Sequence, residues 1–168
     1  SRVLSSSAAN ITFDNLNTLA AGYKHLQIRA ISRDTRAISG SNNVIMTFNG
    51  DSASNYYQLH FLKGDGSNGS TGAEGAASYI LPYTQPSAND TADAFAVAVI
   101  DLLDAFSSSK YTTSRSFRGV NLAAAYSTQV GLSSGMWMNT AALTEIKLEP
   151  ISASFAVGSR FSIYGVKG

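Results

Sequence analysis

Apolar and polar residues alternate along much of this chain with a period of two. Between Lys24 and Ala30 every second residue is apolar, and polar Gln27 and Arg29 stand between them. A period of two is that of a strand with one side in the core and the other in water. The segment therefore predicts a half-buried strand.

Similar patterns predict further strands. Segment 56–61 divides into two faces, Tyr57, Leu59 and Phe61 on one and Tyr56, Gln58 and His60 on the other. Segment 94–100 is apolar on both faces, which indicates a central strand, and segment 100–107 fits either a helical turn or two or a continuation of that strand. The other expected strands are 11–13, 44–48, 78–81, 111–120, 121–126, 130–132, 135–139, 143–148 and 161–166.

The segments between these strands are rich in turn-forming residues. Asn49-Gly50-Asp51 and Pro150 each end a strand pattern, and segment 63–78 is so rich in glycine that it predicts a long mobile loop or a contact loop. Many short strands without alternating helices predict an all-β fold, an antiparallel β-sandwich that is jelly-roll-like and has about eight strands. We expect residues 1–21 to form an N-terminal arm with a first short strand, and residues 22–168 to form the sandwich domain.

The composition narrows the classes of function. Charged residues make up 14% of the 168 residues, against a usual share of about 25%. The 12 Lys and Arg and 11 Asp and Glu residues give a net charge of +1, and the sequence holds no cysteine. Binding to nucleic acid or to an anionic membrane needs clustered Lys and Arg, so we expect neither partner. No apolar run approaches the length of a membrane span, and the polar N-terminus does not have the layout of a signal peptide. A weakly charged surface is typical of a chain that packs against other proteins.

Catalytic chemistry has few candidate residues in this sequence. The two histidines, His25 and His60, both fall on the polar sides of predicted strands, and no Gly-x-Ser-x-Gly motif accompanies them. The densest carboxylates, Asp90, Asp93, Asp101 and Asp104, lack the spacing of a calcium loop and are better explained as turn or capping residues. We therefore expect no enzyme activity, no metal and no cofactor.

Five residues are the candidates for contact with a partner: Phe13, Arg29, Arg33, Tyr56 and His60. The alternation in segment 56–61 turns Tyr56 away from Tyr57 and Leu59, which favours Tyr56 as an interface or ligand residue. Trp137 lies between two methionines and is expected in the core.

A further pattern in the sequence is the order and spacing of four segments. They are 22–29, 48–51 followed by Asn55-Tyr56, 135–140 and 158–166. In these segments the chain resembles small virion proteins of tailed bacteriophages, described as capsid decoration (cement) or tail-fibre-like proteins. The resemblance implies a β-sandwich that is commonly trimeric and sits on a particle, and it carries over no catalytic residue. Segments 1–21 and 63–86 fall outside it.

We therefore expect a virion structural protein, and most specifically a capsid decoration protein on the surface of the phage head. Its expected partners are the major capsid protein and copies of itself in a homotrimer. The alternative is a host-recognition module at a tail or fibre tip, where exposed loops and Tyr56 bind a cell-surface glycan. A third hypothesis, a glycan-processing enzyme, would require two carboxylates roughly 5–10 Å apart.

Overall fold

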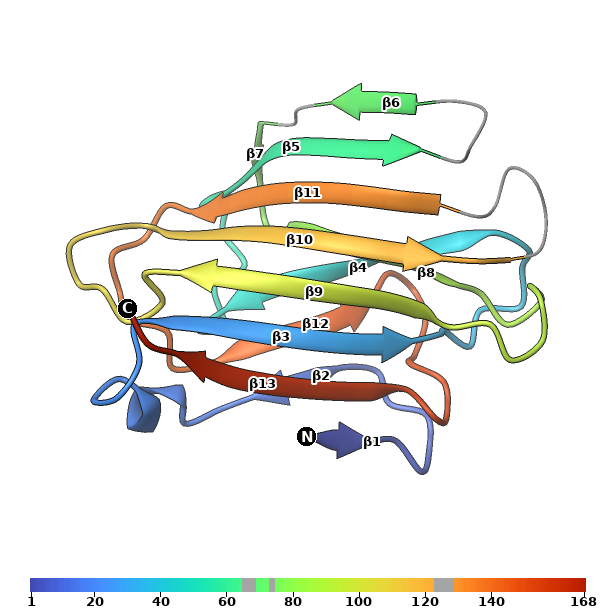
Figure 1. The fold of residues 1–168 in the computed structure, drawn as a ribbon, viewed down its shortest axis with the longest axis horizontal. Coiled ribbons are helices and arrows are strands. Elements are labelled where there is room, and N and C mark those ends of the chain that lie inside the picture. The colour runs from blue at the N-terminus through green and yellow to red at the C-terminus, as the bar shows by residue number, and fades with distance from the viewer. Residues whose placement is uncertain (65–68, 73–74, 123–128) are drawn as a thin grey trace.

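Two antiparallel sheets stack into a sandwich in the computed structural model, which describes residues 1–64, 69–72, 75–122 and 129–168 (Figure 1). The larger sheet has the order β1 (Arg2–Val3), β13 (Arg160–Val166), β3 (His25–Ser32), β9 (Ala96–Leu103), β10 (Thr112–Val120), β11 (Gln129–Trp137), β5 (Tyr56–Gly64) and β6 (Gly69–Gly72), and β7 (Ala76–Ala77) also pairs with β5. The smaller sheet has the order β2 (Ile11–Phe13), β12 (Ile146–Pro150), β4 (Ser41–Phe48) and β8 (Ile80–Pro86).

The all-β sandwich predicted from the alternation is confirmed, with thirteen strands in the described residues instead of about eight. The strand expected at 78–81 begins at Ile80 and continues through Pro82 to Pro86. Of the two alternatives for segment 100–107, the strand is correct as far as Leu103, and a turn follows. The predicted strand 121–126 falls mostly on residues 123–126, which lie outside the described residues. The expected loop 63–78 contains two short strands, β6 and β7.

The N-terminal residues pack onto the sandwich, and the short strand expected at 11–13 is present as β2. β1 pairs with β13 at one edge of the larger sheet, and β2 pairs with β12 in the smaller sheet. Between them the side chain of Leu4 is buried, and the backbone of Ala8 exchanges hydrogen bonds with that of Phe155. A short 3-10 helix, η1 (Leu16–Leu19), follows β2. Three apolar side chains of this segment, Leu4, Ile11 and Leu16, are buried in the main core.

The main core lies between the two sheets. Its apolar side chains come from β3 and β9 on one side and from β4 and β12 on the other, and all are fully or almost fully buried. At one end Phe48, Tyr56 and Trp137 form an aromatic cluster, with 5.6 Å between the ring centroids of Phe48 and Trp137. Trp137 is 1% exposed, which confirms its prediction as a core residue.

Strands β10 and β11 turn small residues toward the smaller sheet. Ser114, Ser116, Ser133 and the two glycines Gly131 and Gly135 alternate with larger residues, and the three serines are buried. The hydroxyl groups of Ser116 and Ser133 lie within hydrogen-bonding distance of each other and of the carbonyl oxygen of Pro82 in β8. β8 therefore lies close against β10 and β11, because no large side chain separates them.

Gly135 shows how close this approach is. A Cβ atom at this position would lie 2.7 Å from Cγ2 of Ile80 and 3.0 Å from the carbonyl oxygen of Tyr57. It also follows the register shift that interrupts the pairing of β11 with β5. The absence of a side chain is what lets β8, β11 and β5 meet here.

We expect Gly135→Ala to lower the free energy of unfolding by about 1–3 kcal/mol, because the added methyl group overpacks the contact with Ile80. Urea unfolding measures this change. Gly119→Ala is the matched control on the neighbouring strand, since its Cβ would meet no atom closer than 3.9 Å. If both variants are as stable as the wild type, β8 does not lie this close to β11.

Candidate interaction surface

The outer face of the larger sheet, the face turned away from the smaller sheet, exposes a continuous set of apolar side chains. The pairing registers place Phe117 of β10 opposite Val99 of β9 and Leu132 of β11, and Leu132 opposite Leu62 of β5. Opposed residues in a sheet point to the same face. These four residues therefore form an apolar row across four neighbouring strands.

A second row extends this surface. It runs from Val3 of β1 past Arg160 to Ile31, Val97 and, beyond Gly119, Val130 of β11. Nine large apolar side chains on this face are exposed by about two fifths to three fifths: Val3, Ile31, Leu62, Val97, Phe117, Val130, Leu132, Tyr164 and Val166. We call this surface the apolar face. Single exposed apolar residues are ordinary, whereas contiguous exposed apolar patches are typical of interaction sites.

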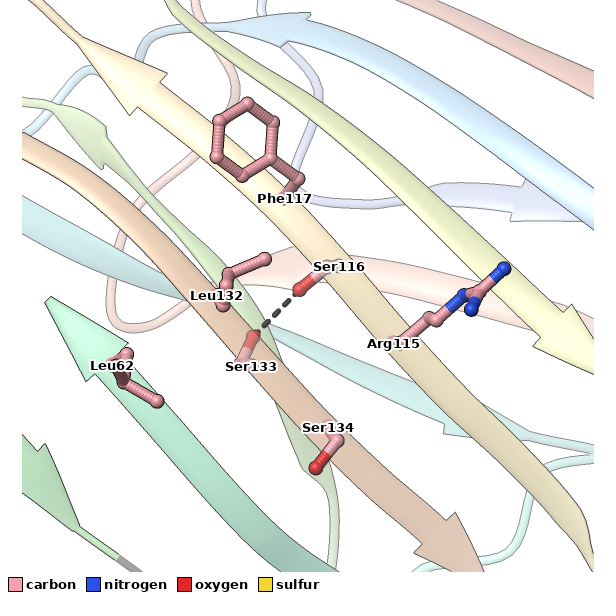
Figure 2. Close-up of a pocket in the computed structure, with 7 residues that line it drawn as sticks. All are labelled: Leu62, Arg115, Ser116, Phe117, Leu132, Ser133 and Ser134. Carbon is pink, nitrogen blue, oxygen red and sulfur yellow. Dashed lines mark hydrogen bonds between the residues drawn. The ribbon is translucent and has the colours of Figure 1, made fainter.

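Three shallow hollows lie on the apolar face. The hollow over β5, β10 and β11 has a volume of about 390 Å³ and is lined by Leu62, Phe117, Leu132 and Arg115 together with serines. Figure 2 shows these apolar side chains coming from three adjacent strands, with the hydrogen bond between Ser116 and Ser133 beside them. Those two hydroxyls are already bound to each other and to Pro82, so the hollow offers a partner mainly apolar contact.

A second hollow, of about 330 Å³, lies over β13, β3 and β9. Arg29 and Arg160 line it together with Tyr164, Ile31 and Val97. The guanidinium carbon of Arg29 lies 5.1 Å from the centre of the Tyr164 ring, a cation–π contact. Its Nε donates to Oε1 of Gln27 at 3.0 Å. The third hollow, of about 370 Å³, lies over β9, β10 and β11 between Phe95, Val97 and Val130.

The outer face of the smaller sheet is different. Its β12 residues Lys147 and Glu149 form an ion pair at 2.9 Å, and Thr47 lies opposite Lys147 on β4. None of the large apolar residues that the structure leaves exposed in its described part lies on this sheet. The two sides of the sandwich are therefore unequal, and only the larger sheet offers an apolar surface.

The structure separates the five predicted contact residues. Arg29 is exposed on the apolar face. Phe13 is half-buried at the end of β2 and packs against the core. The backbone of His60 pairs with Ser134, and its side chain lies outside the described part.

Tyr56 does not point outward, so its expected orientation is wrong. It is fully buried, and its hydroxyl accepts a hydrogen bond from the backbone N–H of Phe48 at 2.9 Å and donates to the carbonyl oxygen of Asp51 at 3.0 Å. Gln58 on the same side of β5 is buried as well, and Tyr57 is half-exposed. Tyr56 can enter the core because its polar end is satisfied by backbone groups. Burial raises the pKa of Tyr56 to about 12.

Arg33 is also internal and does not form a contact surface. Its guanidinium donates to four backbone carbonyl oxygens, those of Ala88, Asp90, Thr91 and Ala94, at 2.7–3.1 Å. The side chain therefore holds the loop between β8 and β9 in place. An arginine fork suits this task because its donors fan out in one plane.

His25 and the carboxylates considered as catalytic candidates make structural contacts of their own. Nδ1 of His25 accepts a hydrogen bond from the backbone N–H of Asp104 at 3.0 Å. Asp90 accepts from the backbone N–H of Gly40, Asp101 pairs with Arg115, and Asp104 pairs with Lys110. Within the described residues no three His, Asp or Glu side chains are grouped as metal ligands.

The residues of the apolar face could not be predicted from alternation, because alternation alone does not say which side of a strand faces the core. In β10 and β11 it is serine and glycine that alternate with Phe117, Val130 and Leu132. Small residues on one side of two neighbouring strands were the available signal, since they permit a close approach of another strand.

Comparison with known proteins adds no relative: no protein-family model matches this chain, and no curated protein matches it. In the ranges that the structure describes, no helix is long and apolar enough to cross a membrane.

We expect Arg33→Ala to lower the free energy of unfolding by about 2–4 kcal/mol, because four carbonyl groups lose a charged donor. Arg33→Lys keeps the charge but not the fork, so its loss should be intermediate. Thermal unfolding and hydrogen exchange in the loop 88–94 measure both. Arg29→Ala, at an exposed position, is the control, and an equal effect there would contradict the structural role of Arg33.

The buried hydroxyl of Tyr56 predicts a loss of stability at alkaline pH. Its pKa is raised to about 12 from an ordinary 10, so its contribution is complete below pH 10 and is lost as the pH rises from 10 to about 12. Tyr56→Phe should cost about 1 kcal/mol at pH 7 and should decline less than the wild type above pH 10. Urea titrations at each pH measure this. Tyr111→Phe, at an exposed position, should follow the wild type, and an identical decline in all three would refute the prediction.

Proposed function

We propose that this chain is a non-enzymatic structural protein that binds other protein chains through its apolar face. The observation that carries the proposal is the exposure of nine large apolar side chains on one sheet, across β1, β13, β3, β9, β10, β11 and β5. Burying the remaining half of one such side chain contributes about 1 kcal/mol, so a handful of them suffice for a stable contact. Aromatic residues such as Phe117 and Tyr164 are the kind that dominate binding energy in interfaces.

The narrower form of the proposal is a capsid decoration protein that binds between major capsid subunits on a phage head. Its support is the resemblance of four ordered segments to small virion proteins, together with the low content of charged residues. A protein of this kind acts by adhesion, because many symmetric copies multiply the strength of each contact. Copies of the chain in a homotrimer remain part of this proposal.

The alternative, a glycan-binding module on a tail or fibre tip, has less support in the geometry. Sugar recognition needs several free polar groups around an aromatic ring. Beside Phe117, the hydroxyls of Ser116 and Ser133 are already engaged and Arg115 is paired with Asp101. Tyr56, the residue on which that hypothesis relied, is buried.

Binding to capsids tests the proposal. Capsids of the phage that encodes this chain, assembled without it, are mixed with purified protein and sedimented. We expect the wild type to co-sediment, and the double variant Phe117→Ser with Leu132→Ser to lose at least about tenfold in affinity, or about 1.4 kcal/mol. Both residues are more than half exposed, so the variant should keep its fold.

The matched control is Ile38→Ser, which removes a similarly exposed apolar side chain from a loop outside the apolar face. It should bind as the wild type does. Equal binding by all three proteins would overturn the role of the apolar face. Labelling of intact virions that finds the chain on the tail alone would overturn the decoration proposal.

A further inference from the structure

The charges on the apolar face are unevenly distributed. Three arginines, Arg29, Arg115 and Arg160, line its hollows, and no described carboxylate lines any of them. Arg115 is compensated, because its Nε lies 3.1 Å from a carboxylate oxygen of Asp101. The other two arginines form no ion pair within the described ranges.

Arg29 and Arg160 are diagonal neighbours on the same face. The register places Arg160 opposite Ile31 and Arg29 opposite Ser162. Arg29 is therefore two residues away from the residue that faces Arg160 on the adjacent strand. Diagonal neighbours are within reach of long side chains, so one ligand can contact both arginines. Asp101 on the same face binds Arg115 directly, and it reaches Arg29 only through the amide of Gln27.

The surroundings hold Arg29 in place without neutralising it. The Tyr164 ring and the amide of Gln27 both contact its guanidinium, and both are uncharged. The two terminal nitrogens of Arg29 donate no hydrogen bond to a described residue. A guanidinium that is oriented in advance and has free donors is suited to a carboxylate, which it can bind with two parallel hydrogen bonds.

We infer that the hollow between β13, β3 and β9 binds an acidic side chain, Asp or Glu, of the protein partner, flanked by apolar residues that cover Ile31 and Val97. The identity of this partner rests on the proposed function. A second copy of this chain supplies no free carboxylate for this hollow from its own apolar face, because the carboxylate described there, Asp101, is already paired with Arg115. A nucleic acid does not fit either, since its affinity requires many more basic residues than two.

A small probe tests the hollow independently of any capsid. Isovalerate joins a carboxylate to an apolar tail, and isovaleramide has the same shape without the charge. We expect isovalerate to shift the side-chain NMR signals of Arg29 and Arg160 and the methyl signals of Ile31 and Val97, and isovaleramide to shift none of them. Equal effects of the two probes, or shifts at Arg115 as large as those at Arg29, would overturn the inference.

The capsid assay provides the second test. We expect Arg29→Gln with Arg160→Gln to weaken co-sedimentation about tenfold and to reduce its dependence on salt. Lys147→Gln, on the smaller sheet and paired with Glu149, is the control and should change binding much less. Unchanged binding of the double variant overturns the inference, as does binding of the wild type to a polydeoxythymidine oligonucleotide that the double variant loses. If the wild type binds no capsid, the proposed function fails while the isovalerate titration still decides the inference.

Discussion

The contact between β8 and the pair of β10 and β11 determines which side chains this protein shows to its surroundings. The carbonyl group of Pro82 lies within hydrogen-bonding distance of the hydroxyls of Ser116 and Ser133, and Ile80 lies against Gly135. Where β8 comes this close, the inner side of these two strands carries the small residues Ser116, Ser133 and Gly135. Because side chains of a strand alternate between its faces, the larger residues between these positions point outward. Phe117, Val130 and Leu132 are exposed for this reason.

This constraint makes the sandwich one-sided. The core between β3, β9 and the smaller sheet contains the main apolar cluster, together with the buried and hydrogen-bonded side chains of Ser32, Tyr83 and Gln85. The apolar face lies on the other side of the larger sheet from this core, and it is the surface that we propose for contact with a partner. Arg29 and Arg160 beside β13 suit the apolar and acidic partner that we infer.

The fold class and several residues could be predicted because they depend on local patterns. The alternation in segment 24–30 lies in β3 with Leu26 and Ile28 buried, and Trp137 is in the core as expected. The predictions for Tyr56 and Arg33 failed for a common reason. Each side chain carries polar atoms that argue for the surface, and each is buried because backbone groups satisfy those atoms. For Tyr56 these groups belong to the turn that precedes β5, and for Arg33 they lie more than fifty residues further along the chain. The N-terminal residues likewise find their partners in β13 and β12, at the far end of the chain.

By itself, then, the sequence determined that the chain forms strands with alternating faces, that they build an antiparallel sandwich, and that its surface is poor in charge. A period of two is a property of each strand and needs no partner to be recognised. Only the tertiary structure decided which face of β10 and β11 is buried. That choice depends on how near β8 lies, and the distance between two sheets is set by side chains that meet across the core rather than by neighbours along the chain.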